Sequence, residues 1–167
     1  VMGGRSTNRL DVIEKVRFED QATVLHTHVL SSATHYLAGT SSGREAVAAG
    51  GSGDADRIQK VRFDDTVAAF QFTNNLSTDK RGLAGAASYG DAIFGGGVAL
   101  VDSIDKVSYD DSAFVILTNT LSVGTEYLSA SSTRTEIVFA GGAISSGPSQ
   151  KVEKLRYDDT AMALMNN

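Results

Sequence analysis

The stretch IQKVRFDD at residues 58–65 decides the fold, because close copies of it recur along the whole chain. The copies are IEKVRFED from Ile13, IDKVSYDD from Ile104 and VEKLRYDD from Val152. The lysines of the four copies are spaced by 45, 46 and 48 residues and are Lys15, Lys60, Lys106 and Lys154. Such a period has to be recognised first, because a missed repeat leads to a wrong fold assignment.

Three further markers recur in the same order between these copies. An apolar run ending in two glycines occurs as VMGG at 1–4, VAAGG at 47–51, AIFGG at 92–96 and VFAGG at 138–142. A Leu-Ser pair stands at 30–31, 76–77 and 121–122, and a further leucine follows at 37, 83 and 128. The chain is therefore an internal repeat with a unit of about 46 residues.

Each unit is predicted to contain four short strands. The sequences VRF, VSY and LRY place β-branched or aromatic residues at alternate positions, which suits a strand. The acidic pair that follows indicates a tight turn, and an apolar run such as residues 66–73 then completes a hairpin. Residues 36–41 form another strand, which turns at 42–44 and pairs with the strand that ends in Gly-Gly. Four-stranded units of about 40–50 residues are typical of propeller blades.

On these residues the units resemble kelch repeats, which combine an apolar run ending in Gly-Gly, a variable loop and an aromatic-Asp strand end. The resemblance covers essentially the whole chain and implies an all-β, kelch-like β-propeller. One departure is the Trp that such repeats usually carry after the aromatic-Asp pair. This chain has no Trp, and the residues near that position are Val24, Ala69, Val115 and Met162. The Gly-Gly after Phe94 and the Ser/Thr/Asn-rich connections are more similar to the degenerate kelch-like repeats of bacteriophage tail and fibre proteins.

The resemblance implies about three complete four-stranded blades and one partial blade. Blades of this family run from the innermost strand outward, with the Gly-Gly strand second. Residues 32–77, 78–122 and 123–167 are then complete blades, and residues 1–31 form a blade without its innermost strand. An open strand edge invites association, and a propeller needs about four blades to close. We therefore expect an incomplete ring that is a segment of a larger propeller, or one that partner chains complete.

Composition limits the classes of function. The chain has 167 residues, which fits one domain, and 41% hydrophobic residues, which can support a core. The absence of Cys excludes a disulfide scaffold, a thiolate zinc site and a cysteine nucleophile. A net charge of −5 argues against a general nucleic-acid binder, and no apolar stretch approaches the ~20 residues of a membrane span.

Three histidines are the candidate metal ligands. His26 and His28 lie on the same side of a predicted strand, and His35 follows after a short loop. Imidazole nitrogens suit zinc, but the histidines do not recur in the other units, which favours ordinary structural histidines. We assign no metal site.

The acidic pairs and the glycine run offer weaker candidates. The pairs are Glu19-Asp20, Asp64-Asp65, Asp110-Asp111 and Asp158-Asp159. Calcium needs six to eight oxygens, so turn capping is the favoured role of these acids. The run Gly95-Gly96-Gly97 lacks the Lys-Ser/Thr of a phosphate-binding loop.

The sequence predicts no enzyme, no catalytic residue and no cofactor. It contains no G-x-S-x-G nucleophile motif. The copper radical oxidases, which are kelch-like propellers similar to galactose oxidase, require a Cys–Tyr crosslink that this chain cannot form. The tyrosines are expected to be packing or rim residues, with Tyr89 in a hairpin loop as a candidate contact residue; the others are Tyr36, Tyr109, Tyr127 and Tyr157.

The repeat also predicts how the scaffold is held together. Val16, Phe18, Val61 and Phe63 are expected to be buried between blades. The repeated lysines can pair with the turn acids, although solvated charges are the favoured interpretation. The Gly-Gly pairs are expected to combine a positive φ with close approach of a neighbouring blade, so that Gly50→Val is more harmful than Gly43→Ala.

The first functional hypothesis is a non-catalytic structural and binding module of a virion, such as a phage tail fibre or appendage. Stacked blades would display variable loops to a host-surface glycan or protein, or to a neighbouring virion protein. The loops after each Gly-Gly are the candidates, at residues 5–11, 52–57, 97–103 and 143–151. The expected location is the virion or the extracellular space. The alternative is a cellular kelch-type protein–protein interaction domain, cytoplasmic or secreted, and a propeller enzyme is the third hypothesis.

Overall fold

The computed structural model describes residues 2–5, 8–26, 28–53, 56–64, 70–71, 75–88, 90–109, 114–157 and 162–164. This part of the chain is all-β and contains no helix, as the sequence predicted. Accordingly, the described residues include no helix that is long and apolar enough to cross a membrane.

Four antiparallel sheets follow one another along the chain, each with its strands in chain order. The first sheet has three strands, β1 (Met2–Arg5), β2 (Arg9–Val16) and β3 (Thr23–Leu25). The second has four, β4 (Ala38–Ser41), β5 (Glu45–Ala49), β6 (Ile58–Arg62) and β7 (Phe70–Gln71). The third contains β8 (Ala84–Ala87), β9 (Asp91–Gly95), β10 (Ser103–Ser108) and β11 (Phe114–Thr120). The fourth contains β12 (Ser129–Ser132), β13 (Glu136–Ala140), β16 (Val152–Arg156) and β17 (Met162–Leu164).

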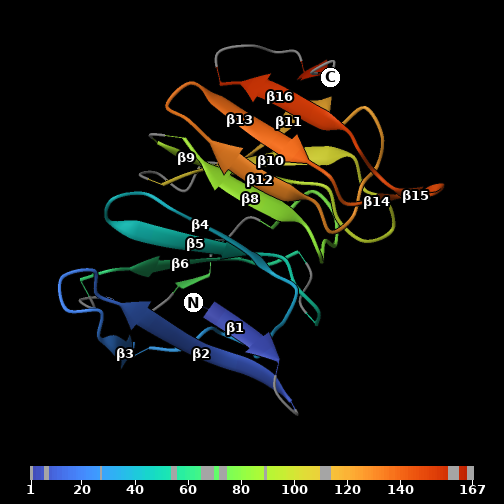
Figure 1. Ribbon diagram of the computed structural model, residues 1–167. Coiled ribbons are helices and arrows are strands. Elements are labelled where there is room, and N and C mark those ends of the chain that lie inside the picture. The colour runs from blue at the N-terminus through green and yellow to red at the C-terminus, as the bar shows by residue number, and fades with distance from the viewer. Residues whose placement is uncertain are drawn as a thin grey trace.

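The sheets are stacked in the order of the chain, from β1–β3 at the bottom of Figure 1 to β12–β17 at the top. Neighbouring four-stranded sheets contact each other mainly through their first strands, because β8 touches both β4 and β12. None of the described sheets closes on itself. A separate small hairpin of β14 (Ala143–Ile144) and β15 (Gly147–Pro148) extends from the fourth unit.

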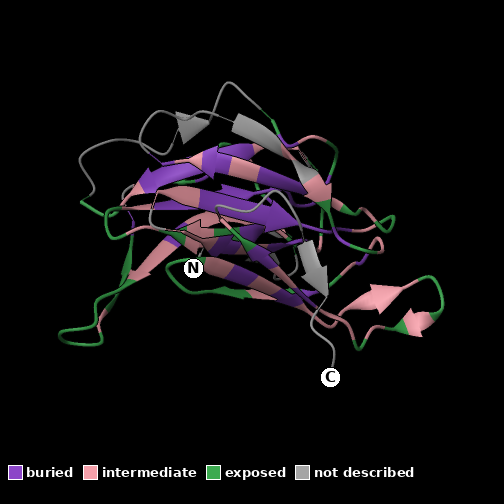
Figure 2. Cartoon of the chain, turned by 90° about the horizontal axis from the view of Figure 1, so that it is seen from above, coloured by how far each residue is buried: buried purple, intermediate pink, exposed green. Residues whose placement is uncertain are grey.

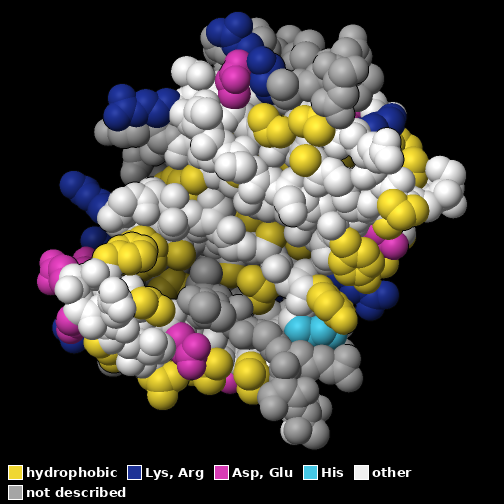
Figure 3. Space-filling view, in the orientation of Figure 1, with side chains coloured by type: hydrophobic (Ala, Val, Ile, Leu, Met, Phe, Trp, Pro, Cys, Tyr) yellow, Lys and Arg dark blue, Asp and Glu magenta, His cyan; other side chains and the backbone are white. Residues whose placement is uncertain are grey.

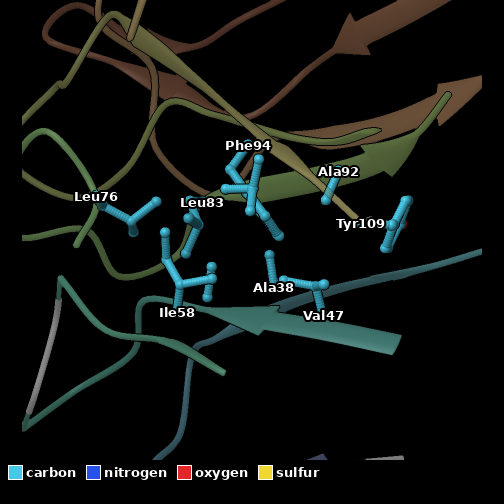
Figure 4. Packing of buried hydrophobic residues seen from close by; sticks show 10 residues of the cluster. Ala38, Val47, Ile58, Leu76, Leu83, Ala92, Phe94 and Tyr109 are labelled. Carbon is cyan, nitrogen blue, oxygen red and sulfur yellow. The ribbon is translucent and has the colours of Figure 1, made fainter. Parts of the chain in front are cut away.

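The hydrophobic core consists of clusters that join neighbouring sheets. The buried residues are concentrated in the strands rather than in the connecting loops (Figure 2). Between the second and third sheets, Ile58 faces Leu83 and Phe94 (Figure 4). A similar cluster between the third and fourth sheets contains Ile93, Ile137 and Phe139. Strands β5, β6 and β9 are buried at almost every position, because both of their faces are covered. Each fully buried Val, Ile or Phe side chain of these strands, such as Val47, Ile58 or Phe94, contributes roughly 1.5–3 kcal/mol to stability.

The recurring leucines of the sequence are core residues. Leu30, Leu76 and Leu121 of the Leu-Ser pairs are each at most 5% exposed. Leu83 and Leu128 are buried as well, and Leu37 packs against the core from a partly buried position. These positions recur because each unit presents the same residue to the space between two sheets.

The first sheet is covered less well than the sequence predicted. Phe18 is 97% exposed and Val16 is 47% exposed, so the expectation that both are buried is wrong. The reason is that β2 ends at Val16 and Phe18 lies in the turn that follows. Phe63 is also 40% exposed, whereas Val61 is buried as expected.

The chain turns sharply at the glycine pairs that follow β5, β9 and β13, at residues 50–51, 96–97 and 141–142, and we call these turns the glycine corners. Two of them bring neighbouring units into backbone contact. Gly50 has φ +72°, and a Cβ there would lie 2.4 Å from the carbonyl oxygen of Lys80. Gly96 has φ +71°, and its Cβ would lie 2.5 Å from the carbonyl oxygen of Thr125. Gly95 is instead the last residue of β9. The structure thus places the third corner one residue later than the AIFGG pattern suggested.

A ladder of backbone hydrogen bonds connects the units at the glycine-corner end. The amide of Tyr127 donates to the carbonyl of Gly82 at 2.8 Å, and the amide of Gly82 donates to that of Tyr36 at 2.9 Å. All three residues have a positive φ, between 55° and 64°. The exposed rings of Tyr36 and Tyr127 meet edge to face with their centroids 6.2 Å apart.

Candidate functional site

Three hairpin turns with the same construction lie at the opposite end of the strands. Each connects the first and second strands of a four-stranded sheet, and we call them the tip hairpins, residues 42–45, 88–91 and 133–136. Their first residues are Ser42, Ser88 and Thr133, and in each turn the backbone amide of that residue donates a 2.8 Å hydrogen bond to the carbonyl of the fourth residue.

A side-chain hydroxyl stabilises each of these turns. Ser42 Oγ accepts a hydrogen bond from the Glu45 amide at 3.1 Å, and Ser88 Oγ accepts one from the Asp91 amide at 2.9 Å. Thr133 Oγ1 accepts the equivalent bond from Glu136 at 3.1 Å. Hydroxyl side chains commonly stabilise turns in this way. The first and fourth residues of the three turns are therefore joined by the same hydrogen bonds. The two central residues differ in sequence and are Gly43-Arg44, Tyr89-Gly90 and Arg134-Thr135.

The acid at the end of each tip hairpin pairs with the repeated lysine of the same sheet. Glu45 Oε2 lies 2.8 Å from Lys60 Nζ. The corresponding distances are 3.5 Å for Asp91 with Lys106 and 3.2 Å for Glu136 with Lys154. Lys60 is buried and also donates a short hydrogen bond to the carbonyl of Tyr109 in the next sheet.

The expectation for the lysines therefore needs correction. The acidic pairs of the sequence follow the strands that carry the repeated lysines. Among the described residues, two acids of these pairs bind arginines instead, as in Arg17–Asp20 at 2.8 Å and Arg62–Asp64 at 3.4 Å. The favoured interpretation of solvated lysines is wrong for Lys60, whose side chain is only 7% exposed. Asp65, Asp110, Asp111, Asp158 and Asp159 lie outside the described residues.

Two tyrosines each connect their own sheet to the sheet before it, close to the tip hairpins. The Tyr157 hydroxyl donates a 3.0 Å hydrogen bond to the carbonyl of Ala87. The Tyr109 hydroxyl lies 3.4 Å from Thr40 Oγ1. Burial raises the pKa of Tyr109 to about 12 and also raises the pKa of Tyr157. Both phenols are therefore protonated at neutral pH.

The tip hairpins surround a cavity of about 830 Å³, which we call the tip cavity. It is lined by residues from all three complete sheets: Ser41, Ser42, Gly43, Arg44, Glu45, Arg62, Ala87, Ser88, Gly90, Tyr109, Ser132, Thr133 and Arg134. Most of these are small or carry a hydroxyl group. Tyr89, the candidate contact residue of the sequence, lies outside the described residues.

The lining of the tip cavity carries excess positive charge. It contains three arginines and one acid, Glu45, whose carboxylate pairs with Lys60. Arg62 pairs with Asp64. No described carboxylate pairs with Arg44 or Arg134, which are both exposed. In Figure 3, Lys and Arg side chains gather along the left edge, where Figure 1 shows the hairpins β4–β5 and β12–β13 turning.

A second cavity of about 730 Å³ lies between the first and second sheets. Its apolar lining residues include Ile13, Val16, Phe18, Val61 and Phe63. Figure 3 shows hydrophobic side chains around a hollow at its lower left. This is the region where the first sheet covers the second incompletely.

The structure does not bring the three histidines together as a metal site. His26 Nδ1 accepts a 3.2 Å hydrogen bond from the backbone amide of His28, and its Nε2 lies 3.2 Å from the carbonyl of Arg62. Both ring nitrogens of His26 are therefore occupied. His35 contacts Tyr36 instead, with ring centroids 4.5 Å apart. The described residues contain no group of three or more His, Asp or Glu that could hold a metal ion.

The remaining sequence candidates have structural roles where they can be seen. Asp20 Oδ1 accepts a 3.0 Å hydrogen bond from the Ala22 amide, which is turn capping. Gly96 and Gly97 form a corner rather than a phosphate-binding loop, because no helix follows in the described chain. The described residues of the loops at 52–57, 97–103 and 143–151 lie at the other end of the strands from the tip cavity. Of residues 5–11, Arg5 belongs to β1 and residues 9–11 belong to β2.

One buried charge pair sets the third unit apart. Lys80 Nζ lies 2.7 Å from Asp105 Oδ2, and both side chains are fully buried. Lys80 also donates a 2.8 Å hydrogen bond to the carbonyl of Ser103. Burial lowers the pKa of Lys80, and the adjacent Asp105 carboxylate opposes that change.

The residues equivalent to Asp105 have longer side chains and other partners. Gln59 and Glu153 accept 2.7 Å hydrogen bonds from the backbone amides of Ser31 and Ser122. The shorter Asp105 pairs with Lys80, which replaces the threonines found at that place in the neighbouring units. The pair therefore has a structural role in the core.

The sequence analysis missed the tip cavity although a signal for it was present. The pattern Ser/Thr-x-x-Asp/Glu occurs at the same place in each of these three units, just before the apolar run that ends in glycine, at 42–45, 88–91 and 133–136. It marks a capped turn whose last residue can pair with the repeated lysine. Neither the family models nor the curated proteins with which the chain was compared match it.

Proposed function

We propose that this chain is a non-catalytic structural and binding module with a kelch-like propeller arrangement. Its blades would be residues 32–77, 78–122 and 123–167, with a partial blade at 1–31. In support of this, each four-stranded sheet lies within one repeat unit, and neighbouring sheets meet at their first strands. That is the contact expected when blades are arranged around an axis with the first strand innermost.

The observation that carries the function is a contrast within the three tip hairpins: the residues that hold each turn are the same in kind, whereas the two central residues differ. The hydroxyl cap and the acid–lysine pair are the same in each. The central residues differ in sequence, and Gly43, Arg44, Gly90 and Arg134 among them line one cavity. A rigid scaffold that presents different side chains is what a display or attachment module requires. The resemblance to phage repeats favours a virion component, such as a tail or fibre protein, that attaches to a host surface or to other virion proteins.

Immunogold labelling of phage particles tests the virion assignment. An antibody against this chain is expected to label the tail or its appendages in purified particles produced by cells that encode the protein. Particles without label, together with soluble protein in the cytoplasmic fraction, would contradict the assignment. Turnover of bacterial surface polysaccharides by the purified chain would contradict the non-catalytic role.

The alternative is a cellular kelch-type domain that binds a protein, and the second cavity favours it. Phe18 and Phe63 are exposed apolar side chains beside a cavity, which suits contact with another chain. In addition, β1 is an edge strand of the described first sheet, and an open strand edge can pair with a strand of another chain. Loss of a co-purifying protein on Phe18→Asp, with particles unlabelled, would favour this alternative.

A further inference from the structure

We propose that the tip cavity binds a short oligosaccharide that carries a carboxylate or sulfate group, with Arg44 and Arg134 pairing with the anion. The inference rests on the proposed function, because it names the class of ligand that the same hairpins display. It is carried by the position of two arginines on separate hairpins that line one cavity.

The first argument is electrostatic. The two guanidinium groups lie in a protein whose net charge is −5, and no described carboxylate neutralises them. Arginine forms paired hydrogen bonds with carboxylate and sulfate groups because its donors form a planar fork. The overall negative charge repels an extended polyanion such as nucleic acid. A small anion can approach the local positive charge without meeting the rest of the surface.

The second argument is the chemistry of the remaining lining. The lining carries the hydroxyl groups of Ser41, Ser132 and Tyr109. Ser132 Oγ donates to the carbonyl of Ala87 and the Tyr109 hydroxyl contacts Thr40, and a hydroxyl oxygen that donates one hydrogen bond can still accept another. Sugars present the same kind of group, so a hydroxyl-rich wall suits a saccharide better than an apolar ligand. A volume of about 830 Å³ lies within the usual range of ligand cavities.

The third argument is rigidity. The backbone of each tip hairpin is fixed by its internal hydrogen bonds and by its acid–lysine pair. The arginines are therefore presented from ordered turns, which reduces the entropy lost when a ligand binds. Binding requires no movement of one sheet relative to another.

Isothermal titration calorimetry of the whole chain tests the inference with four probes. These are 3′-sialyllactose, a sulfated chondroitin disaccharide, uncharged lactose and inorganic sulfate. We expect saturable binding of at least one acidic saccharide, at least about tenfold tighter than lactose or sulfate. Binding should weaken as salt is added, because salt screens exposed charges.

Variants identify the residues involved. Arg44→Gln and Arg134→Gln should each weaken binding of that acidic saccharide at least about tenfold, since each removes a charge-assisted contact. Arg81→Gln is the matched control, because Arg81 is exposed and lies at the glycine-corner end. Unchanged circular dichroism and thermal unfolding in all three would show that the fold is retained.

Each other outcome overturns the inference. Equal affinity for lactose excludes the role of the anion, and equal affinity for sulfate excludes the saccharide. Arginine variants that bind like the original chain place the ligand elsewhere, and absence of binding to both acidic saccharides rejects the site. The proposed function fails separately, because immunogold labelling of particles does not depend on which ligand the tip cavity takes.

Discussion

The hydroxyl of Tyr157 donates a 3.0 Å hydrogen bond to the backbone carbonyl of Ala87, which belongs to the sheet before its own. The Tyr109 hydroxyl also contacts the sheet before its own, where it lies 3.4 Å from Thr40 Oγ1, and Tyr109 is only 3% exposed. At the same position of the repeat, Phe63 is 40% exposed and Phe18 is 97% exposed. The two tyrosines thus contact the first strand of the preceding sheet, which is β4 for Tyr109 and β8 for Tyr157.

Truncation at this aromatic position should change the free energy of unfolding strongly at Tyr109 and hardly at all at Phe18. Tyr109→Ala is expected to lower the free energy of unfolding by about 3–5 kcal/mol, as is usual for a large buried aromatic side chain. Phe18→Ala should change it by less than about 0.5 kcal/mol, because an exposed side chain loses few contacts. Urea denaturation measures both. Similar losses for the two variants would mean that Phe18 is covered in solution.

The Tyr109 phenol should also make stability depend on alkaline pH. Its pKa is raised from 10.0 to about 12 by burial, so the unfolded chain releases this proton at a lower pH than the folded chain. The contribution is complete below pH 10 and is lost as the pH rises to about 12. The difference in unfolding free energy between the original chain and Tyr109→Phe should therefore decrease between about pH 10 and about pH 12. A constant difference across that range would refute the shift.

Removal of one member of the buried Lys80–Asp105 pair should lower the free energy of unfolding strongly. Lys80→Met leaves the Asp105 carboxylate buried without its cation and is expected to lower the unfolding free energy by about 3–5 kcal/mol. The double variant Lys80→Met with Asp105→Leu should be more stable than Lys80→Met alone, because it leaves no buried charge. A double-mutant cycle from urea denaturation measures the coupling. Additive losses would show that the two residues do not interact.

Substitutions at Gly50 and Gly43 should differ strongly in how much they destabilise the fold. Gly50 combines a positive φ with close approach of the Lys80 carbonyl, so Gly50→Val is expected to cost more than about 2 kcal/mol. No atom lies within 4 Å of a Cβ built at Gly43, so Gly43→Ala should be neutral or slightly stabilising. Thermal unfolding ranks the two variants. The reverse order would mean that the corner at Gly50 is misassigned.

The all-β class and the strand positions could be predicted because they depend on local pattern. The repeated run around Lys60 alternates as a strand should, and the glycine corners need a backbone conformation that few other residues adopt. The shift of the third corner from Gly95 to Gly96 could not be read from AIFGG, because three consecutive glycines leave the register open.

The contacts of the candidate site were harder to predict because they join residues far apart in the sequence. Lys60 had acids available on both sides, and its pairing with Glu45 follows from the strand register rather than from proximity in the chain. The tip cavity exists only because three sheets are stacked, so no single hairpin reveals it. Lys80 and Asp105 did carry a signal, since both depart from the repeat in the same unit.

The shared construction of the tip hairpins has a practical consequence for protein engineering. Since the capping hydroxyl and the terminal acid hold the loop by themselves, the intervening dipeptide is a cassette. Libraries that randomise residues 43–44 and 134–135 would vary a shared recognition surface while the strands beneath keep their sequence. Such a chain is a template on which specificity could be selected one dipeptide at a time.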